Sequence, residues 1–422
     1  MKIAIIGAGA AGCFAAANIP YHPDNEVVVF EKAARAMQKI KVSGGGRCNV
    51  THACFDVNEL VEKYPRGKQL LRKTFHQFSP KDTIEWFEQR GVKIKEEDDG
   101  RMFPVSDDSQ TIIDCIWAEM MRQKVQVRFS KGVLRIEAKG EQYLIQFADK
   151  SQYLADKILI ATGGFPKLDQ YSWIEALPQK VEEPVPSLFT FNLPKHPITG
   201  LMGVVAEASV KIAGTKFKEE GPLLITHWGF SGPAILRCSA WAARALSEKN
   251  YHFNISINWL KELTDNDLKE QISSLRQYEG KRLVSNKNPF ELPKRLWEYF
   301  MQRIGIGDQT RWGDLPAAQQ NKLIETLLRD VYEVKGKTTF KEEFVTCGGV
   351  QLKDIDPQTM ESRKQKGIYY AGEITDVDGI TGGFNFQNAW TSGWIAAKSI
   401  VGSSLVDDPD NNESGTRPDS TA

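Results

Sequence analysis

The sequence predicts an α/β protein in which a discontinuous Rossmann-like nucleotide-binding domain carries an inserted β-barrel-like domain and a helical subdomain. Three observations predict it. The first 31 residues read as strand, glycine turn, helix and strand. Proline-rich composition from Pro178 to Pro197 marks a boundary, after which strand-rich and then helical patterns follow. Strand and helix patterns return near the C-terminus, which predicts that the first domain is completed there.

Residues 2–6 form a nearly continuous apolar run, which is typical of a parallel strand buried on both faces. Small apolar residues over 10–19 predict a closely packed helix, and the Val-rich run 26–30 predicts a second buried strand. Residues 126–155 alternate with period two and predict an antiparallel meander. Residues 157–161 predict a further strand.

Residues 188–260 are rich in strand patterns, with a helix expected near Pro233, and 261–330 are helical and charged. A last long helix is expected over 385–401. The predicted domains are, in chain order, 1–185 (nucleotide-binding, first part), 186–260 (β-rich substrate domain, first part), 261–332 (helical insert), 333–350 (return through the β-rich domain), 351–402 (nucleotide-binding, second part) and 403–422 (disordered tail).

Composition narrows the function classes. Lys plus Arg and Asp plus Glu both number 54, so the formal net charge is zero, whereas nucleic-acid binders usually carry a basic excess. The six cysteines show no C-x-x-C spacing, and the six histidines show no metal-ligand spacing. No run approaches the roughly 20 apolar residues of a membrane span. We therefore expect a cytoplasmic protein with no nucleic-acid partner, no membrane partner and no metal.

A dinucleotide motif opens the chain. Gly7, Gly9 and Gly12 fit G-x-G-x-x-G between a strand and a helix, which is the context that the motif requires. The three glycines serve a tight turn, close approach of a pyrophosphate and close helix–strand packing. Glu31 ends the second strand and would accept hydrogen bonds from ribose hydroxyls. The motif by itself leaves NAD and FAD open.

Three later segments favour FAD. Ala161-Thr162-Gly163 ends a buried strand and resembles the strand end that lies near the cofactor in FAD-binding folds. Gly372 precedes Glu373 in a strand end that resembles the C-terminal FAD motif, in which an acid binds the ribityl chain; Asp376 is the alternative acid. Residues 381–387 bring glycines and a helix N-terminus, whose N–H groups would stabilise negative charge on a reduced flavin.

The segment Lys39-Ile40-Lys41-Val42-Ser43-Gly44-Gly45-Gly46-Arg47-Cys48-Asn49 resembles the signature of the bacterial NAD(FAD)-utilising dehydrogenases, or BaiN-type flavoproteins, which include an aminoacetone oxidase. Segments 100–104, 226–233, 346–350 and 371–393 resemble the family's other motifs, in the family's order. The resemblance implies noncovalent FAD and a three-part architecture. Consecutive glycines can also form an anion-holding nest, to which Arg47 would add charge.

The residues expected to contact FAD come from separate stretches of the chain: Gly7, Gly9, Ala10, Ala11, Gly12, Glu31, Lys32, Lys39, Ser43, Gly44, Gly45, Arg47, Cys48, Asn49, Ala161, Thr162, Gly163, Gly372, Glu373, Asp376, Gly382, Gly383, Phe384 and Asn385.

Two residues are candidates for catalysis. His227 lies in a Gly- and Pro-rich turn and is an acid–base candidate, with a structural histidine as the alternative. Cys48 lies in the glycine-rich motif, where a packed thiol is the alternative role.

The sequence thus predicts an FAD-dependent oxidoreductase, an oxidase or dehydrogenase, performing a two-electron reaction on a small organic substrate under the inserted domains. NAD(P)H stays open as a transient reductant, although no second nucleotide-binding motif is present. One alternative is a flavin-dependent RNA-modifying enzyme, for which 280–311 offers Lys281, Arg282, Lys287, Lys294, Arg295, Arg303 and Arg311. Another is a non-enzymatic flavin-binding sensor.

Overall fold

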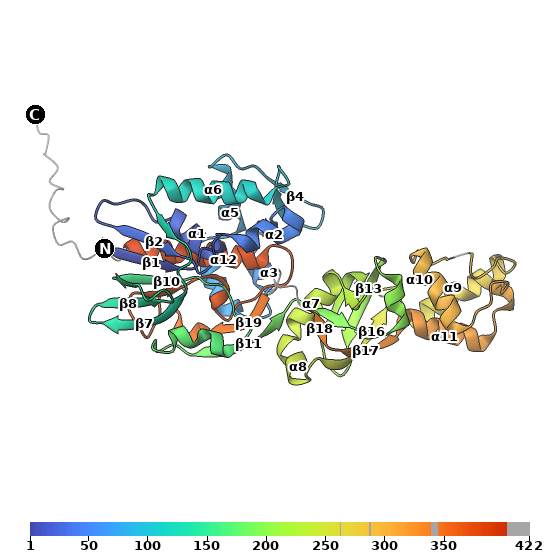
Figure 1. Cartoon of the computed structure of the whole chain (residues 1–422). Coiled ribbons are helices and arrows are strands. Elements are labelled where there is room, and N and C mark those ends of the chain that lie inside the picture. Colours follow the sequence, from blue (N-terminus) through green and yellow to red (C-terminus); the bar gives the residue numbers. More distant parts are fainter. Residues whose placement is uncertain (262, 287, 339–344, 403–422) are drawn as a thin grey trace, which may run out of the picture. The chain divides into compact units, whose positions relative to one another are not determined.

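The computed structural model describes residues 1–261, 263–286, 288–338 and 345–402. These residues form two compact units (Figure 1). Unit 1 comprises Met1–Pro184 and the chain from Gly348 onward, and unit 2 comprises Val185–Cys347. The predicted tail, 403–422, lies outside the described residues.

Unit 1 is built on a five-stranded sheet with the order β20-β10-β1-β2-β6, in which every neighbouring pair is parallel. Its strands are β1 (Lys2–Ile6), β2 (Glu26–Phe30), β6 (Gln126–Arg128), β10 (Lys157–Ile160) and β20 (Ile368–Tyr370). β1 lies in the middle and is buried from Ile3 to Ile6, as a continuous apolar run requires. Because β20 comes from the end of the chain, unit 1 is discontinuous, as the sequence predicted.

A layer of helices packs around α1 (Ala10–Ala17), which contacts both α6 (Ser109–Arg122) and α12 (Phe384–Gly402). The contact is close because the residues are small: a Cβ on Gly393 of α12 would lie 2.7 Å from the carbonyl oxygen of Ala11. On the other side of the sheet lies the antiparallel meander of β7 (Val133–Lys139), β8 (Gln142–Phe147) and β9 (Gln152–Ala155) (Figure 1).

The meander is shorter than predicted. The period-two pattern of residues 126–155 predicts one antiparallel unit, but β6 at its start pairs in parallel with β2 and forms the edge of the main sheet. In β6 the exposed Gln126 and Arg128 flank the half-buried Val127, so the strand shows the alternation that is typical of an antiparallel sheet with one face in water.

The remaining elements of unit 1 connect these layers. They are α2 (Gln38–Gly46), β3 (Thr51–His52), α3 (Val57–Val61), α4 (Lys68–Phe75), α5 (Pro80–Glu88), β4 (Ile94–Glu96), β5 (Arg101–Pro104), and the 3-10 turns η1 (Leu168–Ile174), η4 (Leu352–Asp354) and η5 (Gly372–Ile374). The chain leaves unit 1 in β11 (Val181–Ser187) and returns in β19 (Val345–Val350), and these two strands pair with each other.

Unit 2 holds one seven-stranded antiparallel sheet. In spatial order its strands are β17 (Asp330–Lys335), β16 (His252–Asn258), β13 (Val205–Ile212), β14 (Lys218–Ile225), β15 (Gly229–Ser231), β12 (Thr190–Asn192) and β18 (Lys337–Thr338). The two edge strands, β17 and β18, are separated in sequence only by Gly336, whose carbonyl accepts from Asn192 N at 3.2 Å. The edges therefore meet, and the sheet closes in the manner of a barrel.

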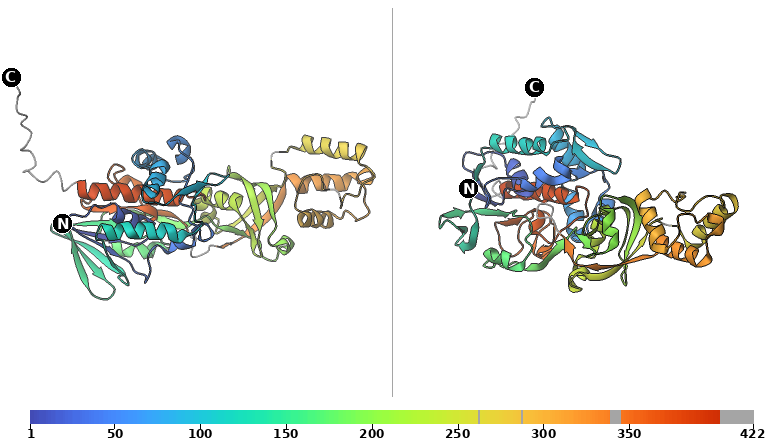
Figure 2. Two further views of the ribbon diagram at one scale, coloured as in Figure 1. Left: turned by 90° about the horizontal axis from the view of Figure 1, so that it is seen from above. Right: turned by 45° about the vertical axis from the view of Figure 1, so that its right-hand side comes forward.

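Two groups of helices belong to unit 2. Helices α7 (Pro233–Trp241) and α8 (Ala243–Glu248) follow β15, and α7 packs on β13 and β14. Helices α9 (Asp265–Tyr278), α10 (Lys294–Ile304) and α11 (Ala317–Leu328) all fall between the neighbouring strands β16 and β17. They gather into one helical group, coloured yellow to orange (Figure 2).

The helical group is tied to the sheet through Asp330, which is 6% exposed. Its carboxylate accepts from Arg303 Nη2 at 2.8 Å, from Trp259 Nε1 at 3.0 Å and from the Tyr332 hydroxyl. A charge this deeply buried is stable only with such partners. In the part of the chain that is described, no helix is both long and apolar enough to cross a membrane.

Candidate functional site

The Gly7–Gly12 turn shows three different uses of glycine. Gly7 has φ +107°, and a Cβ there would lie 2.5 Å from the carbonyl oxygen of Ala161. A Cβ on Gly12 would lie 2.0 Å from the carbonyl oxygen of Gly7. Around Gly9, by contrast, no heavy atom lies within 4 Å of a built Cβ. Gly7 and Gly12 therefore hold the turn against the sheet, while Gly9 presents open space at the start of α1, where Ala10 and Ala11 follow. This is the geometry that a pyrophosphate needs.

Glu31 is locked beside this turn. Its Oε2 accepts from the backbone N of Ala8 at 2.8 Å, and its Oε1 accepts from the backbone N of Ala33 at 2.8 Å. Each carboxylate oxygen keeps a further lone pair. The side chain is thus fixed in position, with capacity left for the hydroxyl groups of a ribose.

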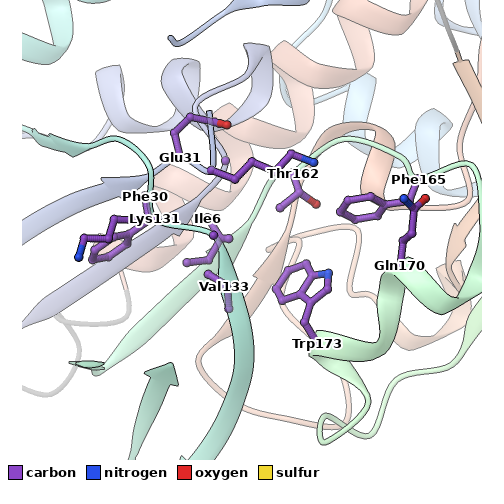
Figure 3. Close-up of a pocket in the computed structure, with 12 residues that line it drawn as sticks. Ile6, Phe30, Glu31, Lys131, Val133, Thr162, Phe165, Gln170 and Trp173 are labelled. Carbon is purple, nitrogen blue, oxygen red and sulfur yellow. The ribbon is translucent and has the colours of Figure 1, made fainter. Parts of the chain in front are cut away.

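A cleft with about 550 Å³ of empty space opens at Glu31. Figure 3 shows Phe165 and Trp173 on one side of it and Phe30, Lys131 and Val133 on the other. The cleft is lined by Ile6, Gly7, Phe30, Glu31, Lys32, Lys131, Gly132, Val133, Thr162, Phe165, Gln170 and Trp173. Its flat aromatic walls and its carboxylate suit the adenosine half of a dinucleotide.

Sequence reasoning assigned Gly7, Glu31, Lys32 and Thr162 to the cofactor but missed the other residues that line this cleft. Lys131 and Gly132 precede the meander, Val133 begins it, and Phe165 and Trp173 follow the Thr162 strand end. No motif marks them. The available signal was indirect, since chain that directly follows the carboxyl end of a strand beside the glycine turn lies at the ligand edge of a parallel sheet.

The glycine-rich loop that resembles the family signature is closed by a hydrogen bond from Cys48 N to Ser43 O at 3.0 Å. Gly44 and Gly45 both have positive φ, +58° and +69°. A Cβ on Gly44 would lie 2.9 Å from the Phe103 ring. A Cβ on Gly45 would have no heavy atom within 4 Å. Gly44 therefore packs inward and Gly45 leaves an open backbone face.

Cys48 does not have the surroundings of a nucleophile. The residue is fully buried, with φ +62°. Burial raises the pKa of its thiol to about 12, against which a hydrogen bond with Ser43 lowers it. The thiol is therefore protonated at neutral pH, and a packing role fits it better than thiolate chemistry.

Arg47 points to partners within unit 1. Its Nη1 lies 2.5 Å from Glu97 Oε1 and 3.5 Å from Asp107 Oδ1. Its guanidinium also lies 4.1 Å from the centre of the Phe103 ring. The charge that the sequence assigned to the cofactor is thus engaged in bracing the glycine-rich loop.

Lys39 joins two of the predicted segments. Its Nζ lies 2.8 Å from Glu373 Oε2, and a Cβ on Gly163 would lie 3.9 Å from that same oxygen. A Cβ on Gly372 would lie 2.9 Å from the Cβ of Ala11. Lys39, the β10 strand end and the Gly372 turn therefore meet beside the start of α1. Nearby, the backbone N of Asp376 donates to Val350 O at 3.1 Å.

The start of α12 lies against the glycine-rich loop. In the orientation that satisfies both of its polar atoms, the Asn49 amide donates to Thr51 O at 2.9 Å and accepts from Gly383 N at 3.0 Å. Asn385 closes the preceding turn through two hydrogen bonds to the backbone of Gly379, at 2.8 and 2.9 Å. The positive φ of Gly382, +127°, belongs to the same turn. This fixed turn aims the N-terminus of a 19-residue helix at the loop.

His52 was not singled out from the sequence. Its ring stacks on Phe384, with 4.7 Å between ring centres and 20° between planes. Burial lowers the pKa of this imidazole. Among the described residues, its Nδ1 has no hydrogen-bond partner. Phe384 is 2% exposed, so it serves as packing for His52 and not as an open face for the cofactor.

His227 alone among the predicted site residues lies in unit 2. It is exposed, at the turn between β14 and β15, with its ring 3.8 Å from that of Trp228. The turn is closed by the backbone N of Thr226, which donates to Gly229 O at 2.8 Å. All the other predicted residues belong to unit 1. Within the described ranges no group of three or more His, Cys, Asp or Glu side chains could hold a metal.

Comparison with known proteins supports a flavin as the ligand of this site in unit 1. Residues 1–399 match the family model described as HI0933-like protein Rossmann domain. The ribosomal RNA dihydrouridine synthase of Escherichia coli K12 is 31% identical over 94% of this chain and 97% of its own length. The 3-dehydro-bile acid delta(4,6)-reductase of Clostridium scindens is 28% identical over 95% of this chain and 99% of its own. The ribosomal RNA dihydrouridine synthase of Haemophilus influenzae is 27% identical over 94% and 97%.

Solved structures share the fold. A quinol–fumarate reductase with menaquinol matches with a TM-score of 0.50 and 13% identity, covering 95% of this chain and 70% of that one. A 3-ketosteroid delta1-dehydrogenase from Sterolibacterium denitrificans matches with a TM-score of 0.50 and 10% identity, covering 95% and 99%. At this identity the likeness concerns the fold alone, and it confirms the predicted fold class.

The predicted partners need correction. From the cofactor motifs we expected a small-molecule substrate and from the zero net charge no nucleic acid, but two of the relatives are named for action on ribosomal RNA. The error came from taking the charge of the whole chain. Unit 2 has 22 Lys and Arg against 18 Asp and Glu, a net charge of +4, and the rest of the chain cancels it.

Proposed function

The chain belongs to the HI0933-like family of flavin-dependent oxidoreductases, and from this premise we propose that it is a ribosomal RNA dihydrouridine synthase that uses FAD. The observation that carries the proposal is the 31% identity with the E. coli enzyme of that name, sustained over 94% of this chain and 97% of that one. Of the sequence-based hypotheses, the flavin-dependent RNA-modifying enzyme is the one that this relation favours.

The chemistry is consistent across the named relatives. Dihydrouridine is uridine with its C5–C6 double bond reduced, and the bile acid enzyme is named as a reductase of delta(4,6) bonds. In uridine this double bond is conjugated with the C4 carbonyl, so C6 accepts a hydride and C5 then takes a proton. With a nicotinamide as reductant, uridine, NAD(P)H and a proton give dihydrouridine and NAD(P)⁺. FAD, when bound and once reduced by the nicotinamide, would supply the hydride for such a step.

The residues of unit 1 would bind and orient the cofactor. The Gly9 side of the turn and the N-terminus of α1 would receive the pyrophosphate, and Glu31 the adenosine ribose. The aromatic cleft would hold the adenine. Lys39 and Glu373, paired at 2.8 Å, lie at the β10 strand end, where the ribityl chain would pass. The N-terminus of α12 would face the edge of the flavin ring on which negative charge develops upon reduction.

The proposal is tested by assaying the RNA itself. Purified protein, FAD and NADPH are incubated with unmodified transcripts of the ribosomal RNAs, which are then digested and analysed by mass spectrometry. We expect uridines to gain two hydrogen atoms at a defined position, and NADPH to be consumed in step. A parallel arm offers a 3-oxo-delta(4) steroid in place of RNA. Reduction of the steroid with no dihydrouridine in any transcript would overturn the proposal.

A second, genetic experiment uses ribosomal RNA made in the cell, so its result does not depend on how a transcript folds in the assay. Ribosomal RNA from cells lacking the gene should lack dihydrouridine at the site modified in wild-type cells, and a plasmid copy should restore it. A Gly9→Ala variant, which leaves the fold uncrowded but blocks the approach of a pyrophosphate, should not restore it.

A further inference from the structure

The C-terminal end of α9 carries an exposed aromatic side chain. Tyr278 is 76% exposed, the most exposed of the large hydrophobic side chains in the described part of the chain. Exposing a tyrosine forgoes the burial that usually stabilises it. Aromatic rings are also the side chains on which unpaired bases stack.

The backbone next to Tyr278 is firmly held. Two segments, 280–284 and 310–313, lie side by side. Their backbone N–H groups bond across, from Gly313 to Gly280 at 2.9 Å, from Trp312 to Arg282 at 3.0 Å and from Val284 to Thr310 at 2.9 Å. Buried side chains hold the two paired segments to the core of unit 2: Trp312 is fully buried, and Trp297 Nε1 donates to Val284 O at 3.0 Å. Side chains on this pair are therefore presented from a rigid base.

The exposed side chains of this pair are basic. Lys281, Arg282 and Arg311 are all exposed, and Leu283 pairs with Arg311 across the two segments. Arg282 Nη1 lies 3.2 Å from Glu279, in an ion pair whose arginine side chain is 60% exposed and still open to a phosphate. Over residues 280–311 the sequence has seven Lys and Arg against three Asp and Glu, a net charge of +4. Three of these seven cations, Lys281, Arg282 and Arg311, lie on the paired segments, with Glu279 and Asp314 next to them in the sequence.

We propose that Tyr278, Lys281, Arg282 and Arg311, called here the α9-end patch, form an RNA-docking surface. The three cations would contact consecutive phosphates of a single-stranded loop of ribosomal RNA, and Tyr278 would stack on one of its bases. This inference rests on the proposed function and gives it a place on unit 2. An aromatic ring flanked by fixed cations matches a ligand that alternates flat bases with negative charges, whereas an acidic peptide supplies no flat bases.

The test separates charge from stacking. Binding of the FAD-loaded protein to an unmodified ribosomal RNA transcript is followed by fluorescence anisotropy over a series of salt concentrations. Lys281→Ala, Arg282→Ala and Arg311→Ala in one chain should raise Kd roughly 30-fold at low salt and reduce the slope of log Kd against log salt by about two. Tyr278→Ala should raise Kd about tenfold with an unchanged slope, and Tyr278→Phe should restore binding.

A matched control removes three charges elsewhere on unit 2. Lys211, Lys216 and Lys249 are exposed on other elements, and their triple alanine variant should change Kd and slope little. Flavin absorbance and melting temperature should be those of the wild type in every variant, which shows that each folds. Equal losses in the two triple variants would mean a general field effect and would overturn the patch.

The outcomes also distinguish the two proposals. If the wild type makes dihydrouridine while the patch variants bind and react normally, the patch is wrong and the function stands. If the wild type binds transcripts through the patch but forms no dihydrouridine, the patch stands and the function is wrong. A wild type that binds no RNA overturns both, and patch variants that lose binding to an acidic peptide but not to RNA would assign the surface to a protein partner.

Discussion

Units 1 and 2 build their sites from different parts of the chain. In unit 1 the cofactor cradle is mainly backbone: Gly9 leaves open space, Gly7 and Gly12 pack against carbonyl groups, and Glu31 is held by two backbone N–H groups. In unit 2 the α9-end patch consists of exposed side chains on a firmly bonded base.

This difference explains why the flavin site can be recognised in a sequence, whereas the proposed RNA-docking surface cannot. A backbone site needs glycines at fixed spacing and therefore produces a motif. A side-chain surface for phosphates needs only positive charge in roughly the right place, which many sequences satisfy. Each of the following predictions tests this contrast, beginning with the largest effect.

Gly12→Val should have the largest effect, because its Cβ would stand 2.0 Å from the carbonyl oxygen of Gly7. We expect a loss of about 4 kcal/mol or more of stability and no flavin binding, measured by thermal unfolding and flavin titration. Gly9→Ala is the matched control: its Cβ meets nothing within 4 Å, so the melting temperature should hold while flavin affinity falls at least about tenfold. Equal stability of both variants would contradict the assignment of separate glycine roles.

Asp330→Ala should rank second, and it should act on unit 2. The substitution leaves Arg303 without its carboxylate and removes the acceptor of Trp259 and Tyr332. Breaking a buried ion pair of this kind costs about 3–5 kcal/mol. Denaturant unfolding followed by tryptophan fluorescence should show the loss, while flavin absorbance stays. Loss of flavin at the same denaturant concentration would show that the two units unfold as one.

Glu31→Gln should have a smaller effect, confined to the cofactor. The glutamine amide has the same shape as the carboxylate. Its NH₂ group, however, would replace an oxygen that accepts a hydrogen bond from the backbone N–H of Ala8 or Ala33. The ribose hydroxyls would also lose a charged acceptor, and a hydrogen bond to a charged group is worth about 1.5–3 kcal/mol, so Kd for FAD should rise roughly 10- to 100-fold. Glu26→Gln, at the other end of the same strand, is the control and should retain FAD. Unchanged flavin retention by Glu31→Gln would remove the ribose assignment.

The smallest effect concerns His52 and pH. Burial lowers the pKa of His52 in the folded chain, whereas in the unfolded chain the imidazole titrates near its usual 6.5. As pH falls below that value the unfolded chain takes up a proton that the folded chain resists, so stability decreases. His52→Asn should flatten this part of the stability–pH curve between about pH 7 and 5. Parallel curves for the two proteins would show that His52 does not titrate on unfolding.

Much of unit 1 could be predicted from the sequence. Strand and helix limits near residues 2–30 and the terminal helix followed from continuous apolar runs and glycine spacing, which depend on local chain geometry. The flavin family followed from the resemblance of residues 39–49 and of four further segments to the family's motifs. Arg47 could not be placed, because its partner Glu97 lies 50 residues away and the pairing arises only in the fold. The aromatic wall of the cleft was missed for the same reason. Phe165 and Trp173 line the same cleft as Val133 only because the folded sheet brings these distant segments together.

Unit 2 was less accessible. Its strand-rich and helical halves could be recognised, but the closure of the sheet depends on β17 and β18 reaching opposite edges across Gly336, and no local pattern encodes that. The RNA for which two relatives are named was not expected, because a zero net charge for the whole chain conceals a unit of +4. Counted over the predicted domains, the net charges are +3 for 186–260, +1 for 261–332 and 0 for 333–350, so no single predicted domain stands out as basic.

The place at which the helical group joins the sheet has an evolutionary consequence. Helices α9 to α11 leave after β16 and return at β17, and these strands are directly paired, with Ile257 opposite Asp330. The two ends of the insertion therefore lie as close as the ends of a hairpin turn, and closing the loop between them costs little additional entropy however long it is. The loops of the segment can lengthen or shorten without shifting any strand register, provided that Arg303 stays in place to pair with the buried Asp330. A family with this design can change the exposed surface of one insertion while the flavin-binding unit stays as it is.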